Sequence, residues 1–361
     1  MSSRPVAVVL GTRPEIIKLA GVIDGLGDAA IVIHTGQHYD EGLSQVFLDG
    51  LGLPRPAHQL ELGGLPRAAQ IGRGTEQVAE LLTAIGPAAV VVQGDTNSAL
   101  AGALAANSTG FPLVHVEAGL RSYDRAMPEE HNRVLVDHLS DLLAAPTAVA
   151  VANLAREGLT GEQVMCCGNT VVEAVRRQLP APEHRARLLA QYGLRPEGYV
   201  LATLHRPENT DDPVTLRRIL VELGSLSVPV VLPIHPRTVA AARAAGIENL
   251  LDPLRVVDPM DGGTFLGLAA ESAVIVSDSG GVQEEVTVLG RPLVVVRRST
   301  ERPEAFEHHA VLVTPDGVAA ATSAYLTDVA GLHRRLEALP SPYGDGFASD
   351  AIVRAVRVMF L

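Results

Sequence analysis

The sequence predicts an α/β protein made of two Rossmann-like, doubly wound domains that face a cleft. Short apolar runs rich in valine alternate with helical segments along the N-terminal half, and the same alternation restarts near Tyr199. This alternation is typical of parallel sheets with helices on both faces. The chain has 361 residues, which suits two domains of about 150 residues each. Ligands bind at the C-terminal edges of such strands, so we expect the ligand in the cleft.

The N-terminal half contains four strand candidates, because its apolar runs are short and show little polar alternation. Pro14 suits the first turn of a helix, which places a helix start next to Glu15. The expected strands cover residues 6–10, 30–33, 88–92 and 111–116. One helix is expected to begin at residue 15, and two others are expected over 65–85 and 97–106.

The C-terminal half repeats the pattern and predicts a second open sheet. The expected strands cover residues 199–203, 230–233, 254–257, 274–277 and 292–296, and a closing helix is expected over 350–360. Prolines 180, 182 and 196 indicate that the segment 179–197 joins the two domains.

Composition excludes several classes of function. The net charge of −12 argues against a nucleic-acid or anionic-membrane surface. We expect no membrane span, because no apolar run reaches about 18 residues, and the first ten residues lack the layout of a signal peptide. The only cysteines, Cys166 and Cys167, are adjacent, which excludes a disulfide framework and a CxxC metal site. We therefore expect a cytoplasmic protein with no nucleic-acid or membrane partner.

Carboxylates cluster after two of the predicted strands. Asp95 and Glu117 each follow an apolar run, and Glu129 and Glu130 form a further pair close behind. Parallel strands bring their C-terminal ends to one edge of a sheet, so these side chains are expected to form an acid/base set. Carboxylates crowded in a poorly solvated cleft cannot all stay ionised, and one or more should be protonated near neutral pH.

A phosphate site is predicted after the strand over 274–277. Ser279, Gly280 and Gly281 precede a helix start, where backbone N–H groups and the helix dipole attract anions. A glutamate one turn into that helix can accept hydrogen bonds from a ribose diol. The alternative is an ordinary strand–turn–helix junction with a serine cap.

Two cations and two histidines are further candidates at these edges. Arg13 is a candidate clamp for a diphosphate and Lys18 lies one turn further on, although either can be a solvated surface charge. His205 and His235 each follow a strand of the second half, where a purely structural role is the alternative.

No metal or cofactor is expected from the sequence. His34 and His38 are four residues apart, but a turn separates them, so we reject a metal pair. The sequence has no HExxH, DxD or cysteine cluster, and no GxGxxG follows the first strand, so a metal or an NAD site is not indicated.

Together these motifs resemble the non-hydrolysing UDP-N-acetylglucosamine 2-epimerases, in order and over about residues 6 to 358. The motifs that carry the resemblance are Gly11-Thr12-Arg13-Pro14-Glu15, Gln93-Gly94-Asp95-Thr96, His115-Val116-Glu117-Ala118-Gly119-Leu120-Arg121, Pro128-Glu129-Glu130, Gly168-Asn169-Thr170, Asp278-Ser279-Gly280-Gly281-Val282-Gln283-Glu284-Glu285 and Thr300-Glu301-Arg302-Pro303-Glu304. The resemblance implies a glycosyltransferase-B type fold, a homodimer, and interconversion of UDP-GlcNAc and UDP-ManNAc. It also implies an N-terminal catalytic domain over 1–170, completed by a C-terminal helix over 347–361, and a UDP-binding domain over 171–346.

The resemblance also implies roles for individual residues. The implied catalytic residues are Asp95, Glu117, Glu129 and His205, and the candidates for binding the UDP-sugar are Arg13, Lys18, Arg133, His235, Phe265, Ser279, Gly280 and Glu285. Phe265 would stack on uracil, the alternative being a core residue. The turn Gln37-His38-Tyr39-Asp40 departs from the Gln-His-Arg form of members that bind a second UDP-GlcNAc, which leaves allosteric activation and the exact hexosamine open. The loop before Pro128 is shorter than in those members, which leaves Glu130 as the alternative to Glu129.

The chemistry restricts the reaction. The C2 hydrogen of a hexosamine is not acidic, so the C1–O bond must break first, giving UDP and a 2-acetamidoglucal. Protonation of C2 from the opposite face and return of UDP then give the epimer. A hydrolysing epimerase that releases ManNAc and UDP, an epimerase of a modified UDP-hexosamine, a glycosyltransferase and a non-catalytic UDP-sugar sensor are the alternatives.

Overall fold

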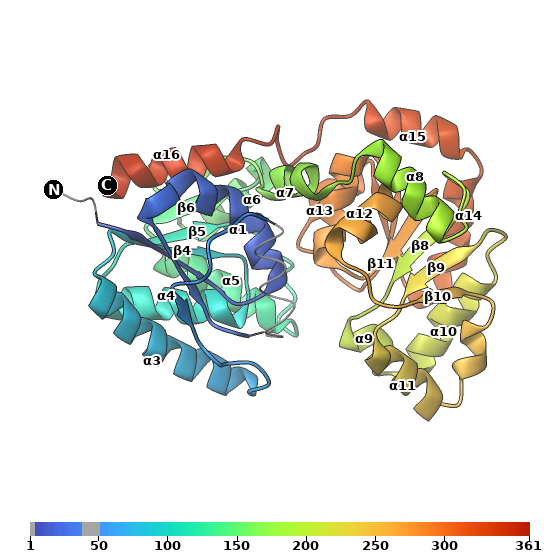
Figure 1. Cartoon of the computed structure of the whole chain (residues 1–361), viewed down its shortest axis with the longest axis horizontal. Helices are drawn as coiled ribbons and strands as arrows, with labels where there is room; N and C mark the ends of the chain where they lie inside the picture. The colour runs from blue at the N-terminus through green and yellow to red at the C-terminus, as the bar shows by residue number, and fades with distance from the viewer. Residues whose placement is uncertain (1–3, 38–50) are drawn as a thin grey trace. The chain divides into compact units, whose positions relative to one another are not determined.

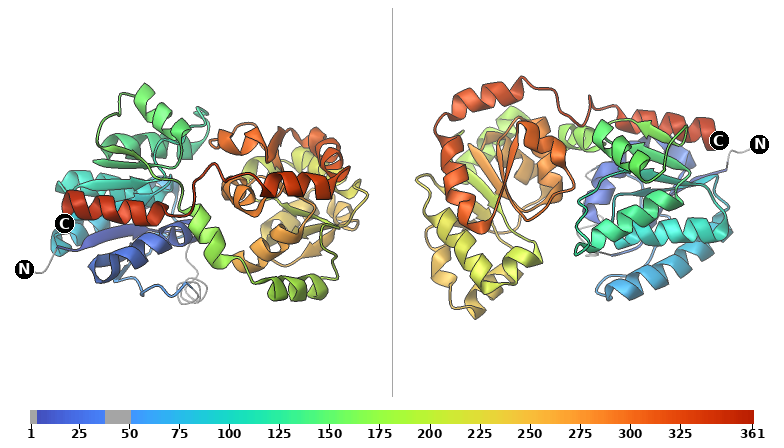
Figure 2. Two further views of the ribbon diagram at one scale, coloured as in Figure 1. Left: turned by 90° about the horizontal axis from the view of Figure 1, so that it is seen from above. Right: turned by 180° about the vertical axis from the view of Figure 1, so that it is seen from behind.

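The computed structural model describes residues 4–37 and 51–361. Contacts divide the chain into two compact units, the first made of Met1–Ala174 with Tyr343–Leu361 and the second of Val175–Pro342. Each unit contains one parallel sheet with helices on both faces (Figures 1 and 2). The predicted class, two Rossmann-like doubly wound domains, is confirmed.

The first unit is built on a sheet of strand order β3-β2-β1-β4-β5-β6-β7, in which neighbouring strands are parallel. Its strands are β1 Val6–Leu10, β2 Ala30–His34, β3 His58–Gln59, β4 Ala89–Gln93, β5 Leu113–Val116, β6 Leu142–Ala145 and β7 Val164–Cys166. Its helices are α1 Arg13–Leu26, α3 Arg67–Ile85, α4 Asn97–Thr109, α5 Pro128–Leu139, α6 Ala148–Arg156 and α16 Ala348–Phe360, and α7 Val171–Gln178 spans the division between the units.

The second unit has the strand order β10-β9-β8-β11-β12-β13, again parallel. Its strands are β8 Val200–Thr203, β9 Val230–Pro233, β10 Arg255–Val257, β11 Val274–Ser277, β12 Leu293–Val296 and β13 Ala310–Val313. Its helices are α8 Pro182–Gln191, α9 Pro207–Thr210, α10 Pro213–Gly224, α11 Pro236–Ala244, α12 Gly262–Glu271, α13 Gly280–Leu289, α14 Val318–Leu326 and α15 Val329–Glu337. Short 3-10 turns cover Gly27–Ala29, Glu248–Leu251, Pro303–Glu307 and Pro315–Gly317.

The predicted strands over 6–10, 230–233 and 274–277 have the expected bounds, and the others differ by one or two residues. β5 begins at Leu113 rather than Phe111, since Pro112 has no N–H to donate to a neighbouring strand. The expectation that 179–197 joins the domains is wrong, because that segment contains α8 and belongs to the second unit. Pro182 occupies the first turn of α8, where proline starts a helix instead of breaking one.

Burial on both sheet faces explains why the strands are apolar throughout. Val6, Val8 and Leu10 of β1 pack with α1 and α16, whereas Ala7 and Val9 face the helices on the opposite side.

Among the described residues, no helix combines the length and apolar character needed to span a bilayer.

Helix α16, at the end of the chain, belongs to the first unit. It packs on α1, where a side chain at Gly25 would lie 2.9 Å from Val353 Cγ2. The backbone N–H of Ser349 donates to Glu173 at 2.9 Å, and the Arg357 guanidinium donates to the Gly25 carbonyl at 2.8 Å. The helix is therefore fixed by apolar packing along its length and by polar contacts near both ends.

We predict that Ile352→Ala destabilises the first unit, because Ile352 is 0% exposed in the core between α1 and α16. The cost should be about 2–5 kcal/mol in the free energy of unfolding. Val358, on the same helix, is 86% exposed, so Val358→Ala should change stability by less than about 0.5 kcal/mol. Urea unfolding of both variants, fitted with separate transitions for the two units, measures the difference. Equal stabilities for the two variants would contradict the packing of α16.

Candidate active site

The predicted carboxylates of the first unit lie at the C-terminal edge of its sheet. Asp95 follows β4 and Glu117 follows β5. Glu117 has φ 72 and is 5% exposed, a left-handed conformation that a non-glycine residue adopts only when its surroundings impose it. Lys18 Nζ lies 2.7 Å from Glu117 Oε2, and the Gln93 amide donates to the same oxygen. The structure therefore brings Lys18 to Glu117 as a buried ion pair rather than leaving it on the surface.

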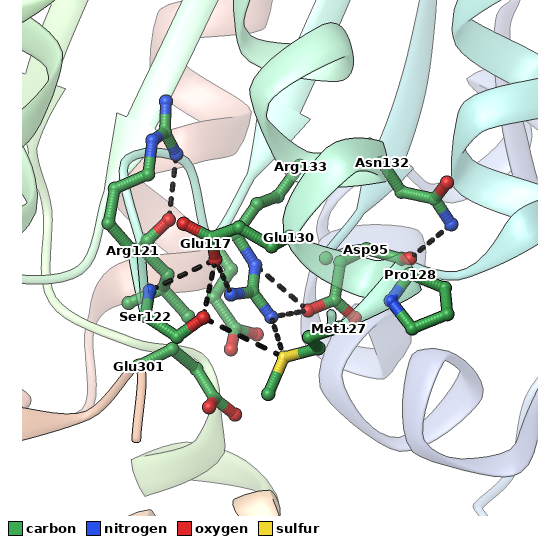
Figure 3. Close-up of polar contacts among 12 residues, drawn as sticks. Asp95, Glu117, Arg121, Ser122, Met127, Pro128, Glu130, Asn132, Arg133 and Glu301 are labelled. Carbon is green, nitrogen blue, oxygen red and sulfur yellow. Dashed lines mark hydrogen bonds and ion pairs between the residues drawn. The ribbon is translucent and has the colours of Figure 1, made fainter. Parts of the chain in front are cut away.

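Arg133 links Asp95 to helix α5 (Figure 3). Its Nε donates to Asp95 Oδ2 at 3.1 Å and its Nη2 donates to the same oxygen, while Nη1 pairs with Glu130. The Asn132 amide also donates to the Asp95 carbonyl at 2.8 Å. Arg133, at 2% exposure, thus holds the catalytic candidate Asp95 in place. The spacing of these residues in the sequence did not predict this contact.

The adjacent residues Glu129 and Glu130 occupy different environments. Glu130 is buried, and its carboxylate accepts hydrogen bonds from Ser122 N at 3.0 Å, Tyr123 N at 2.8 Å and the Arg133 guanidinium. Glu129 is exposed and, among the described residues, makes no side-chain hydrogen bond or ion pair. Successive helical residues point about 100° apart, so one glutamate faces inward and the other outward. The carboxylate of Glu130 is occupied by its partners, whereas that of Glu129 is available to a ligand.

The N-terminus of α1 contains a buried acid that sequence reasoning did not single out. Glu15 accepts hydrogen bonds from Gly11 N at 3.0 Å, Thr12 N at 2.7 Å and Thr96 Oγ1 at 2.8 Å. Burial raises the pKa of Glu15 to about 7, although these hydrogen bonds lower it. Its sequence signal is the spacing Thr-x-x-Glu, which is typical of a helix N-terminus. Glu15 connects the turn of Arg13, which is exposed, to the turn that follows Asp95.

His205 of the second unit is oriented by a buried aspartate. Its Nδ1 lies 2.9 Å from Asp278 Oδ1, and its backbone N–H donates to the same carboxylate. Asp278 is 0% exposed and also accepts from Arg206 N and the Asn209 amide. Burial alone would raise the pKa of Asp278, but the hydrogen bond and charge of His205 and the bonds from Asn209 and Arg206 lower it overall. The fixed Nδ1 leaves Nε2 of this 57%-exposed side chain for proton or anion contacts.

The predicted phosphate turn starts α13 as expected. Ser279 is the N-cap residue and Gly280 begins the helix. A side chain at Gly280 would lie 2.8 Å from Arg302 Nη1, so a larger residue there would require the Arg302 side chain to move. Arg302 is fixed by Glu284, whose Oε1 lies 2.8 Å from Nε. Glu285 is half-buried one turn into the helix, and the arrangement supports the predicted anion site.

The remaining candidates occupy the same edge of the second sheet. His235 is exposed after β9, and Phe265 is half-buried in the first turn of α12, the helix that follows β10.

His34 of the first unit is buried, and its Nδ1 lies 3.0 Å from both Gly36 N and the Gln59 amide. His38 and the rest of the turn through Asp40 lie outside the described residues. Within the described ranges, no group of three or more His, Cys, Asp or Glu side chains could hold a metal ion.

Comparison with known proteins identifies the family. The family model described as UDP-N-acetylglucosamine 2-epimerase matches residues 27–357. A UDP-N-acetylglucosamine 2-epimerase of Methanococcus maripaludis is 37% identical, with 97% of this chain and 98% of that protein covered. A Pseudomonas aeruginosa protein named UDP-2,3-diacetamido-2,3-dideoxy-D-glucuronate 2-epimerase is 38% identical, with 82% of this chain and 84% of that protein covered.

A solved structure gives the same fold over the whole chain. The UDP-GlcNAc 2-epimerase of Methanocaldococcus jannaschii, in complex with UDP-GlcNAc and UDP, matches with a TM-score of 0.88 and 36% identity, covering 98% of this chain and 99% of that chain. The match supports the glycosyltransferase-B type of the two domains. On these findings the chain belongs to the UDP-N-acetylglucosamine 2-epimerase family, whose members are isomerases acting on nucleotide sugars.

Proposed function

We propose that the protein interconverts UDP-GlcNAc and UDP-ManNAc by epimerisation at C2, through elimination of UDP and its re-addition. The observation that carries the proposal is the pair Asp95 and Glu117, held at one sheet edge by Arg133 and Lys18. The Methanocaldococcus relative, which binds UDP-GlcNAc and UDP in its solved structure, supports the same substrate here.

Departure of UDP requires donors on the diphosphate. We assign this role to Arg13, to His205 and to the helix start at Ser279 and Gly280. Preorganised donors of this kind contribute on the order of 3 kcal/mol each to stabilisation of the transition state. Asp278 supports the role of His205, because it fixes the ring through Nδ1.

Proton transfer at C2 requires an acceptor on one face of the sugar and a donor on the other. Asp95, Glu117 and Glu129 supply the carboxyl groups, each worth about 10²–10⁴-fold in rate. Coupled carboxylates titrate as a set, so we assign the roles to the group and not to individual residues. Glu129 is the exposed member of the Glu129–Glu130 pair, which favours it for contact with the sugar.

A modified UDP-hexosamine is the second candidate substrate. The observation that favours it is the Pseudomonas relative, which is named for a UDP-diacetamido-dideoxyglucuronate and is 38% identical to this chain. The reaction at C2 would be the same, because the leaving nucleotide and the C2 acetamido group are shared.

The proposal predicts deuterium at C2 when the protein turns over UDP-GlcNAc in D₂O, together with formation of UDP-ManNAc. Mass spectrometry and proton NMR of the recovered nucleotide sugars measure both. A parallel reaction with UDP-2,3-diacetamido-2,3-dideoxy-D-glucuronate tests the second substrate, and the double variant Asp95→Asn/Glu117→Gln is the inactive control. Free UDP formed in step with sugar turnover would indicate the hydrolysing reaction, and unlabelled substrate in both reactions would contradict epimerisation.

We predict that Glu129→Gln lowers activity and that Glu130→Gln lowers stability. Glu129→Gln should lower kcat by about 10²–10⁴-fold and leave thermal stability unchanged, because this side chain is exposed. Glu130→Gln should cost about 1–3 kcal/mol of stability, because buried donors lose an acceptor. Steady-state kinetics and thermal melting of both variants test the assignment. A stable Glu130→Gln protein without activity, together with an active Glu129→Gln protein, would show that Glu130 and not Glu129 is the catalytic residue.

We predict that His205 and Asp278 act as one unit. His205→Asn and Asp278→Asn should each lower kcat, and the double variant should be little worse than either single variant, because both changes remove the same oriented imidazole. The kcat values of the four proteins in this cycle, compared at equal folded fraction by circular dichroism, give the coupling. Fully additive losses would show that the two residues act independently.

A further inference from the structure

A buried chain of charged side chains lies beneath the carboxylate edge of the first unit. His115 and Asp137 are 0% exposed and Arg121 is 4% exposed. His115 Nδ1 lies 2.6 Å from Asp137 Oδ1, and Arg121 Nη1 lies 2.7 Å from Asp137 Oδ2. Arg121 continues the chain to Glu157, which also lies 3.3 Å from Nε2 of the half-exposed His138. None of these residues belongs to the candidate site described above.

Both nitrogens of His115 face hydrogen-bond acceptors. Nδ1 faces the Asp137 carboxylate, and Nε2 lies 2.9 Å from the carbonyl oxygen of Gly94, which can only accept. Asp137 also accepts from Arg121 and from Gly119 N at 3.1 Å, so its oxygens act as acceptors throughout. Burial alone would raise the pKa of Asp137, but the charge and hydrogen bond of His115, followed by those of Arg121, lower it overall.

A neutral imidazole does not fit this arrangement. It has one N–H, so its second nitrogen would present a lone pair to an oxygen lone pair inside a fully buried site. Such an unsatisfied contact is destabilising. A doubly protonated ring satisfies both contacts and balances charge, because the cations His115 and Arg121 then face the anions Asp137 and Glu157.

The partners of His115 lie in the two turns that present the candidate acid/base residues. Gly94, with φ 68, immediately precedes Asp95, and Gly119, with φ 83, lies two residues after Glu117. A side chain at Gly119 would lie 2.4 Å from the Ala150 carbonyl, so this turn is closely packed as well. His115 fixes the first turn through the Gly94 carbonyl, and Asp137 fixes the second through Gly119 N.

We propose that His115 is a buried imidazolium that, together with Asp137, positions Asp95 and Glu117 for proton transfer at C2. It is a positioning residue, because it contacts the backbone of the turns and not the sugar. Its protonated state is independent of the proposed function, whereas its effect on catalysis rests on that function. The two parts are therefore tested separately.

The protonation state is tested by nitrogen-15 NMR of the full chain labelled at histidine. The His115 signals, assigned as those missing from His115→Gln, should show two protonated nitrogens at pH 7. The exposed His184 serves as the internal reference. Shifts of a neutral tautomer for His115 at pH 7 would overturn the imidazolium, whatever reaction the protein catalyses.

The catalytic part is tested with a matched buried histidine. His333 of the second unit is 2% exposed and likewise lies 2.9 Å from a carboxylate, that of Glu197, and 2.9 Å from a carbonyl, that of Ala273. Ala273 precedes β11, at the strand end opposite Asp278. His333→Gln therefore removes an equivalent interaction away from the candidate site.

We expect His115→Gln to lower kcat for C2 exchange by about 10–100-fold with KM for the UDP-sugar within about twofold, because the proposed nucleotide contacts are unchanged. His333→Gln should leave kcat at the wild-type value. A folded His115→Gln protein with wild-type kcat, or equal losses in both variants, would overturn the positioning role. If His115→Gln does not fold, backbone-to-side-chain correlation experiments on the wild-type chain assign the His115 ring signals, and Asp137→Asn provides the second kinetic variant.

Discussion

The ion pair between Arg133 and Asp95 determines how the carboxylate edge of the first unit is built. A guanidinium at 2% exposure needs anionic partners, and α5 supplies one of them, Glu130, three residues earlier on the same helix. The planar fork of arginine can bind two carboxylates at once, which a lysine ammonium cannot do with fixed geometry. Glu130 in turn holds the backbone at Ser122 and Tyr123. One guanidinium therefore fixes the turn after β4, the start of α5 and the loop before it.

Nine of the thirteen strands in the described residues were predictable because burial on both faces makes parallel strands continuously apolar, whereas β3, β6, β7 and β13 were not predicted. β1 and β11 were located to the residue for that reason. β3, which is the two residues His58 and Gln59 at the sheet edge, has no such signal. The proline-rich segment that contains α8 was misassigned, because a proline in the first turn of a helix and a proline in a linker look alike in a single sequence.

The position of a candidate residue was predictable where the residue directly follows a strand, and it was not predictable where the packing of one element on another decides the contact. Asp95 and Glu117 were found from their positions after β4 and β5. The expected contact of Arg133 with substrate stays a prediction, whereas its pairing with Asp95 depends on the packing of α5 against the turn after β4. The sequence showed Asp278 only as the first residue of a glycine-rich motif. Its contact with His205 was not predicted, because the two residues are 73 positions apart in the sequence.

Three buried carboxyl groups show that the pKa of an acid in this fold depends on whether its partners offset the effect of burial. Asp137 and Asp278 each face a histidine ring, and both have pKa values below the usual range despite complete burial. Glu15 accepts hydrogen bonds from neutral groups, two amide N–H groups and the Thr96 hydroxyl among them, so burial dominates and its pKa rises to about 7. A hydroxyl can donate to a carboxylate or accept from a carboxylic acid, so Thr96 is compatible with either state of Glu15. Glu15 is not one of the carboxylates for which protonation near neutral pH is expected from the sequence. Glu15 joins the turns of Arg13 and Asp95 through these hydrogen bonds, whereas Asp137 faces the Arg121 guanidinium and the His115 ring.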